Sequence, residues 1–161
     1  MDGKNNFLLM RLSKDFTLQE LTVSDTAVKH GISNIPNQDQ ITNLILLCQF
    51  ILQPIKEHFG KPVIINSGYR SPELCLLVNS TVTSQHTKGQ AADFEIKGVS
   101  NKELADWIVA NLDYDQCILE YWIKEEPNSG WVHCSYSFDL SRKQYLKAVK
   151  TDKGTLYSQV S

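Results

Sequence analysis

The amino-acid sequence predicts an α+β fold in which an antiparallel or mixed sheet packs against helices from the N-terminal part of the chain. Three observations indicate this class. Helix-capping and helix-periodic segments dominate up to Gly60, β segments dominate from Val63 onwards, and one capped helix is inserted among those strands near residue 100. Helices followed by mixed strands are typical of α+β domains, in which helices and sheet form separate layers around one core.

Two short helices are predicted at the start of the chain. Thr17, with Glu20 three residues later, makes a capping box that begins a helix near Leu18. A second helix is expected over residues 25–30. It should stop at Gly31, because glycine readily takes the left-handed conformation that ends helices.

A long helix that begins after Asn37 should form the main core helix, and we place no chemistry on it. Gln40 occupies the capping-box position three residues after Asn37. Pro54 is expected to kink this helix and Gly60 to end it. Its apolar residues recur at helical spacing: Ile41, Leu44, Ile45, Cys48, Ile51, Leu52 and Ile55.

The following segments alternate between strands and loops. A short buried strand is predicted over residues 63–65, and the turn at 67–72 restarts as a helix near Glu73. A polar loop over 79–83 leads to a strand over 91–96. Strand residues alternate between two faces, so Ala91, Asp93 and Glu95 should share one face and Ala92, Phe94 and Ile96 the other.

The remaining elements are one helix and two β pairs. Ser100 and Glu103 form another capping box, which opens a helix to about Asn111. Two β segments, 116–122 and 131–136, are joined by a turn-rich linker, and a last hairpin is predicted over 144–149 and 155–159.

Length and composition indicate one globular domain, residues 1–161, with 1–15 as an N-terminal extension and 138–161 as a C-terminal hairpin and tail. Apolar residues make up 42% and charged residues 21%, as is ordinary for soluble proteins. The net charge of −2 gives no basic field for nucleic acid. No run reaches the ~18 apolar residues that a membrane helix needs.

The four cysteines show no CxxC pairing, so we expect them to be reduced and to pack as small apolar residues in the core.

Two histidines and an aspartate are candidate metal ligands. His86 lies in a polar loop, and Asp93 follows it on an alternating strand where an unpaired carboxylate would be costly. His133 should share a strand face with Trp131 and Ser135. Two imidazoles and one carboxylate leave a fourth position for water, which is typical of catalytic zinc, although other divalent metals accept the same donors. A surface-loop histidine is the alternative for His86.

Glu120 is the candidate general base. If Trp122 lies opposite Trp131 in a hairpin, Glu120 falls directly opposite His133, about 5 Å away at Cβ. Glu120 also interrupts an apolar stretch, so desolvation should raise its pKa, as a base beside an activated water requires. The alternative is a Glu120–His133 ion pair that only satisfies both groups.

Residues 84–93, Ser-Gln-His-Thr-Lys-Gly-Gln-Ala-Ala-Asp, match every fixed position of the SxHxxGxAxD signature. In this stretch the chain resembles the zinc D-alanyl-D-alanine carboxypeptidases and their murein-peptidase relatives, whose fold the hedgehog signalling domain shares. The resemblance extends to residues 67–72 and 130–135. It covers roughly Phe16 to the C-terminus and is most like the small phage and bacterial members.

The resemblance implies that His86, Asp93 and His133 bind zinc, and that Arg70 meets a carboxylate or carbonyl of the substrate. A structural salt bridge is the alternative for Arg70. We also assign substrate binding to Trp131 and to Ser84, as a hydrogen-bond donor near the site or, alternatively, as a turn cap.

The sequence departs from its relatives at the base. Several relatives carry a glutamate three residues before the last histidine, or a histidine two before it, whereas Gly130 and Trp131 stand there in this chain. Neither side chain accepts a proton, so the base must come from elsewhere. Glu120 is our choice, and Glu125 and Glu126, in a loop expected to be exposed, are the runners-up.

The predicted function is zinc-dependent hydrolysis of an amide bond in the peptide part of bacterial peptidoglycan, by a D-Ala-D-Ala carboxypeptidase or an endolysin-like murein endopeptidase. The alternative is a zinc-stabilised binding or virion-structural module without turnover. We expect a monomer that binds the peptidoglycan stem peptide. The N-terminus shows no signal peptide, so we expect cytoplasmic synthesis, with action on the cell wall after lysis-type release or as a virion component.

Overall fold

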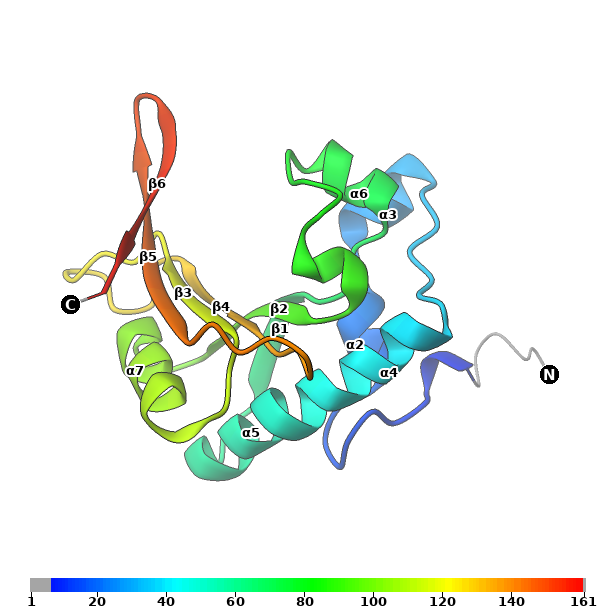
Figure 1. Ribbon diagram of the computed structural model, residues 1–161, viewed down its shortest axis with the longest axis horizontal. Helices are drawn as coiled ribbons and strands as arrows, with labels where there is room; N and C mark the ends of the chain where they lie inside the picture. Colours follow the sequence, from blue (N-terminus) through cyan, green and yellow to red (C-terminus); the bar gives the residue numbers. More distant parts are fainter. Residues whose placement is uncertain (1–6, 161) are drawn as a thin grey trace.

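The computed structural model describes residues 7–160 and confirms the predicted α+β class (Figure 1). Its strands form one six-stranded sheet in the order β1-β2-β4-β3-β5-β6. Neighbours are antiparallel except β3 and β5, which run parallel, so the sheet is mixed. The strands are β1 (Val63–Ser67), β2 (Ala91–Ile96), β3 (Gln116–Glu120), β4 (Trp131–Ser135), β5 (Gln144–Thr151) and β6 (Gly154–Gln159).

The helices begin close to where the capping residues predict. Thr17 and Asn37 both make complete capping boxes, and Ser100 caps its helix by accepting from the backbone N–H of Lys102. The helices are α2 (Leu18–Thr22), α3 (Asp25–His30), α4 (Gln38–Leu47), the π-helix η1 (Cys48–Leu52), α5 (Gln53–Phe59), α6 (Pro72–Leu77), the 3₁₀-helix η2 (Gln85–Lys88) and α7 (Asn101–Asn111).

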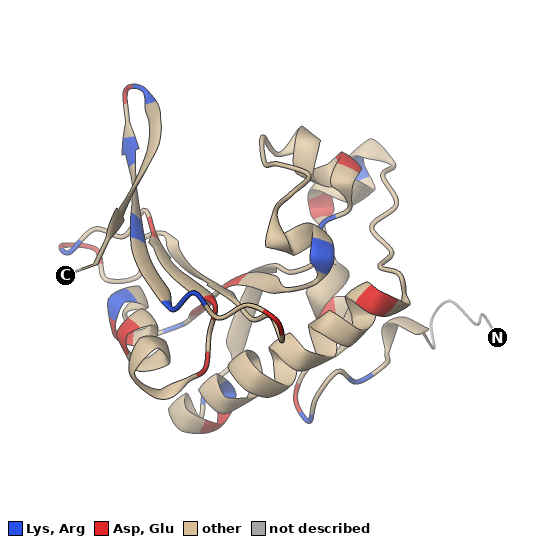
Figure 2. Cartoon of the chain, viewed as in Figure 1, with Lys and Arg blue, Asp and Glu red and all other residues tan. Residues whose placement is uncertain are grey.

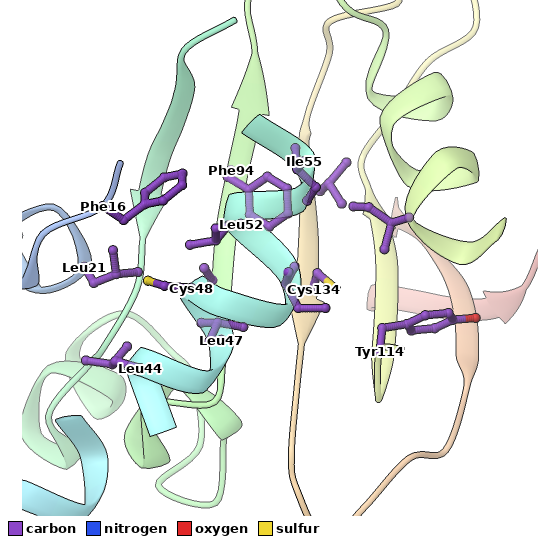
Figure 3. Packing of buried hydrophobic residues seen from close by; sticks show 14 of the residues in the cluster. Phe16, Leu21, Leu44, Leu47, Cys48, Leu52, Ile55, Phe94, Tyr114 and Cys134 are labelled. Carbon is purple, nitrogen blue, oxygen red and sulfur yellow. The ribbon is translucent and has the colours of Figure 1, made fainter. Parts of the chain in front are cut away.

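The predicted long helix is continuous from α4 through η1 to α5. Pro54 has no N–H to donate to the preceding turn, and the widened π-helical turn at Cys48–Leu52 lies directly before it. The helix ends at Gly60, which has a positive φ of 62°. Figure 3 shows this helix lying across the sheet, with Leu52 and Ile55 among the residues that pack near Phe94.

Helices α4, α5 and α7 cover one face of the sheet and leave the central strands open on the other face, which positions the site. The inner face carries Ala92, Phe94 and Ile96 of β2, all buried in the core as the alternation predicts. Residues of α4, α5 and α7 complete that core, and these helices lie on one side of the sheet in Figure 1. Asp93 and His133 therefore point to the opposite face.

Two details differ from or extend the sequence predictions. The strand over residues 63–65 was expected to be buried, but β1 is an edge strand and its Ile64 side chain is 41% exposed. All four cysteines are free and buried, as expected, and Cys117 lies opposite Cys134 on β3 and β4.

The N-terminal segment is docked on the long helix from Leu12 onwards. Leu12 is buried, and the Gln53 side-chain oxygen accepts hydrogen bonds from the Ser13 hydroxyl (2.8 Å) and the Asp15 backbone N–H (3.0 Å). Residues 1–6, on which the signal-peptide prediction partly depends, lie outside the described residues. Within residues 7–160, none of the helices has the length and apolar character that a membrane crossing requires.

Candidate active site

A cleft of about 650 Å³ opens on the uncovered face of the sheet. One wall is the segment after α6 (Val78 to Thr83), and the other includes Tyr157 of β6. These segments stand on opposite sides of the central strands in Figure 1. The cleft is also lined by the candidate ligands, the first-choice base and the candidate substrate-binding residues: Arg70, Ser84, His86, Asp93, Glu120, Trp131 and His133.

Three of these residues bring their donor atoms to one point. Asp93 on β2 and His133 on β4 are cross-strand partners, and η2 places His86 beside them. The Asp93 Oδ1 atom lies 2.9 Å from His133 Nδ1 and 3.3 Å from His86 Nε2, and the two imidazole nitrogens are 3.3 Å apart. All three residues are buried.

Neighbouring groups fix the orientation of the candidate metal ligands. His86 Nδ1 lies 2.7 Å from the carbonyl oxygen of Gly68, which can only accept, so Nδ1 carries the hydrogen and the Nε2 lone pair faces the other ligands. The second oxygen of Asp93 accepts from Arg70 Nη2 at 2.6 Å. Burial alone would raise the pKa of Asp93, but the adjacent His86 and His133 lower it below its usual range.

The three ligand atoms of His86, Asp93 and His133, called the triad below, are spaced to fit a divalent cation. Three lone-pair atoms that face one another repel unless a proton or a cation lies between them. Around tetrahedral zinc with ligands at about 2.0–2.1 Å, neighbouring ligand atoms are separated by about 3.3 Å. The separations of 2.9, 3.3 and 3.3 Å in this chain agree with that value.

Glu120 lies on the cleft face, but the predicted register of its strand pair is wrong by two residues. Glu120 pairs with Trp131, and Ile118 stands opposite His133. A shift of two residues keeps every side chain on its face, so Glu120 becomes a diagonal neighbour of His133, roughly 7 Å away at Cβ. Its exposed fraction is 9%, and this burial raises its pKa, with Asp93 adding to the rise and His133 and Arg70 opposing it.

The backbone beside Glu120 explains the departure from the expected base position. Gly130 has a φ of +64°, and a Cβ built on it would lie 1.7 Å from the Glu120 carbonyl oxygen. No larger residue fits there without moving β3. Tyr121, directly after Glu120, also has a positive φ of 53°, and its N–H is held by the Ala148 carbonyl at 2.9 Å.

We therefore expect Gly130→Ala to lower the free energy of unfolding by more than about 3 kcal/mol, because a steric overlap with backbone adds to the conformational strain. Gly98→Ala is the matched control. Gly98 also has a positive φ (+77°), but the nearest atom to its added Cβ is Lys61 Nζ at 3.6 Å. This variant should lose only about 1 kcal/mol. Urea denaturation of both variants measures the difference, and equal losses would contradict the steric explanation.

The other predicted site residues are placed as follows. The Ser84 hydroxyl accepts from the His86 N–H at 3.3 Å, so in this structure it caps η2, which was the alternative to a substrate contact. Trp131 packs edge-on against Tyr121, and its buried indole N–H has no hydrogen-bond partner among residues 7–160. Glu125 and Glu126 are exposed and do not line the cleft.

One polar cluster at the cleft, formed by Asp115, Arg142 and Gln85, was not predicted from the sequence. The Asp115 carboxylate is buried and accepts from Arg142 Nη2 (2.6 Å), from the Arg142 backbone N–H (2.8 Å) and from Gln85 Nε2 (2.9 Å). Gln85 and Arg142 both line the cleft. A lone aspartate before a strand and an arginine before a hairpin carry no spacing signal, so only the folded structure reveals their pairing.

The Asp115–Arg142 pair should make stability depend on pH. Burial would raise the pKa of Asp115, but the hydrogen bonds from Arg142 and Gln85 lower it below its usual value. A lowered folded pKa adds stability above the unfolded pKa of about 3.9, and this stability is lost as the pH falls through the folded pKa. Arg142→Gln should cost about 2 kcal/mol at pH 7, reduced from the value for a fully buried pair because the Arg142 side chain is 37% exposed.

Urea denaturation of wild type and Arg142→Gln between pH 7 and pH 2.5 measures this effect. The difference in unfolding free energy should be largest near pH 7 and shrink below about pH 4, where Asp115 is protonated first in the unfolded chain and, at lower pH, in the folded protein. A difference that stays constant over this range would show that the ion pair is not its source.

Comparison with known proteins agrees with this geometry. The family model described as Peptidase M15 matches residues 14–135, about three quarters of the chain. The matched segment contains the three candidate ligands, Glu120 and Arg70, whereas Arg142 and the β5–β6 hairpin lie beyond it. A search of curated proteins returns no match. The resemblance noted in the sequence is thereby confirmed, and the chain belongs to the Peptidase M15 family.

Proposed function

We propose that this protein is a zinc-dependent peptidase that hydrolyses an amide bond in the peptide part of bacterial peptidoglycan. The observation that carries the proposal is the convergence of His86 Nε2, Asp93 Oδ1 and His133 Nδ1 on the floor of an open cleft. Membership of the Peptidase M15 family supports a metal-dependent peptidase. One hydrophobic core within residues 7–160 and a cleft wall supplied by β6 support the assignment of residues 1–161 to one peptidase domain.

His86, Asp93 and His133 would hold the metal. When bound, zinc would supply Lewis-acid chemistry, which lowers the pKa of water and polarises a carbonyl group. The buried, oriented donors provide what such an ion requires, because the Gly68 carbonyl and the Arg70 guanidinium fix the directions of His86 and Asp93.

Glu120 would serve as general base. It would accept the proton of the attacking water and pass it to the leaving amine. It lies on the cleft face as a diagonal neighbour of His133 and lines the same cleft as the three candidate ligands. Its raised pKa brings it closer to neutral pH, where proton transfer in both directions is efficient.

Arg70 would position the substrate. Its Nε donates to Ser67 Oγ at 2.7 Å and its Nη2 to Asp93, so the salt bridge that was its alternative is present. That salt bridge does not use the whole guanidinium, because Nη1 has no partner among residues 7–160. Since Arg70 lines the cleft, Nη1 is available for a substrate carboxylate or carbonyl.

Digestion of purified peptidoglycan tests the proposal. We expect the zinc-loaded protein to release peptide fragments, whose masses distinguish loss of a terminal D-alanine from cleavage within the stem or cross-link. Chelation should abolish release, and added zinc should restore it. Stoichiometric zinc without any release of fragments would instead indicate a metal-stabilised binding module.

A further inference from the structure

We propose that Arg142 forms a second anion subsite in the cleft, which recognises a free carboxylate of the substrate away from the scissile amide. This inference rests on the proposed function and narrows its substrate class. Stem peptides of peptidoglycan carry free carboxylates in addition to the amide that is cut, so a peptidase with such a subsite selects among them.

The geometry holds the Arg142 guanidinium in a fixed position. Its Nε donates to Asp115 Oδ1 at 2.9 Å, and its Nη2 donates to Asp115 Oδ2 at 2.6 Å and to Gln85 Oε1 at 3.0 Å. Asp115 is itself anchored by Gln85 Nε2, and its side chain is fully buried. Asp115 and Gln85, which are hydrogen-bonded to each other, therefore fix the orientation of the arginine.

The outward edge of this guanidinium faces the cleft. Arg142 is 37% exposed and lines the cleft, and its Nη1 has no hydrogen-bond partner among residues 7–160. A guanidinium whose inner edge is satisfied presents its remaining N–H groups to a carboxylate at little entropic cost. Figure 2 shows basic residues in the loop that leads into β5, where Arg142 lies.

The subsite is linked directly to the proposed metal centre. Gln85, which accepts from Arg142, immediately precedes the candidate ligand His86 in η2. Arg142 and His86 line the same cleft, so one substrate could contact both. Because residue 142 lies beyond the segment matched to the family, this selectivity would belong to the C-terminal part of this chain.

Two synthetic stem peptides that differ only in one free carboxylate, replaced by a carboxamide in the second, test the proposal. Wild type should prefer the carboxylate peptide in kcat/KM by about tenfold to a hundredfold, the value of one charge-assisted hydrogen bond. In Arg142→Gln the ratio of the two kcat/KM values should fall to about one. A ratio that survives in this variant would assign the carboxylate to Arg70 and overturn the proposal.

Two further variants separate recognition from folding and from charge. Asp115→Asn/Arg142→Gln removes both charges, so no buried carboxylate is left unpaired, and its ratio should also be about one. Lys143→Gln removes a positive charge from the same loop, but Lys143 pairs with Asp113 and does not line the cleft. Lys143→Gln should keep the wild-type ratio of kcat/KM values. An equal loss of preference in this variant would show that the net positive charge of the loop, and not a subsite at Arg142, causes the preference.

Equilibrium binding of the same two peptides to the zinc-loaded protein distinguishes failure of the subsite from failure of the proposed function. Tighter binding of the carboxylate peptide, lost in Arg142→Gln, would support the subsite even if neither peptide is cleaved. Equal affinities would overturn the subsite even if both peptides are cleaved.

Discussion

Glu120→Gln is expected to retain zinc and fold while losing about 10²- to 10⁴-fold in kcat, the usual contribution of a general base. Glutamine has nearly the same shape but accepts no proton, and it removes a buried carboxylate whose pKa is already raised by desolvation. The triad atoms lie on β2, β4 and η2, so the substitution on β3 leaves them in place. Turnover of peptidoglycan fragments, measured beside zinc content and circular dichroism, checks this prediction.

Glu125→Gln is the matched control for charge and residue type. Glu125 is exposed in the loop between β3 and β4 and does not line the cleft, so this variant should stay within about twofold of wild type. An active Glu120→Gln variant would remove Glu120 from the mechanism. A large loss in Glu125→Gln would instead indicate that the loop closes over the substrate and supplies the base.

The helices and the faces of the strands were predictable because their signals are local. Capping residues such as Thr17 and Asn37 specify helix starts through bonds to residues three positions away, and the structure contains those bonds. Alternation on β2 similarly places Phe94 in the core and Asp93 on the open face. The signature over residues 84–93 added the family, which local patterns alone do not give.

The register of β3 and β4 was not predictable from the sequence. The prediction extended the first strand to Trp122, opposite Trp131, but the left-handed residue Tyr121 ends β3 at Glu120. Positive φ at a tyrosine has no sequence signal, because it is imposed by the contact with Gly130 and the bond to Ala148. Glu120 remained on the correct face only because the error was an even number of residues.

His86→Ala is expected to lose both zinc and activity. Removing one of three ligands leaves Asp93 and His133, which hold a divalent ion far more weakly, and without the ion the water is not activated. Turnover should fall on the order of 10³-fold or more, since the metal contributes several kcal/mol to the transition state. Zinc content of the purified variant and its turnover of peptidoglycan measure the two losses.

Thermal unfolding separates loss of the ligand from loss of structure, because His86 is buried and its removal also affects the apo protein. Zinc at 100 times its Kd should stabilise wild type by about 2.7 kcal/mol, whereas His86→Ala at the same concentration should show almost no zinc-dependent shift in Tm. His30→Ala removes an exposed histidine whose side-chain hydrogen bond, within residues 7–160, is to the Thr26 carbonyl in α3, so its zinc response should match wild type. A full zinc response in His86→Ala would place the metal elsewhere, and the peptidase mechanism would then lack its centre.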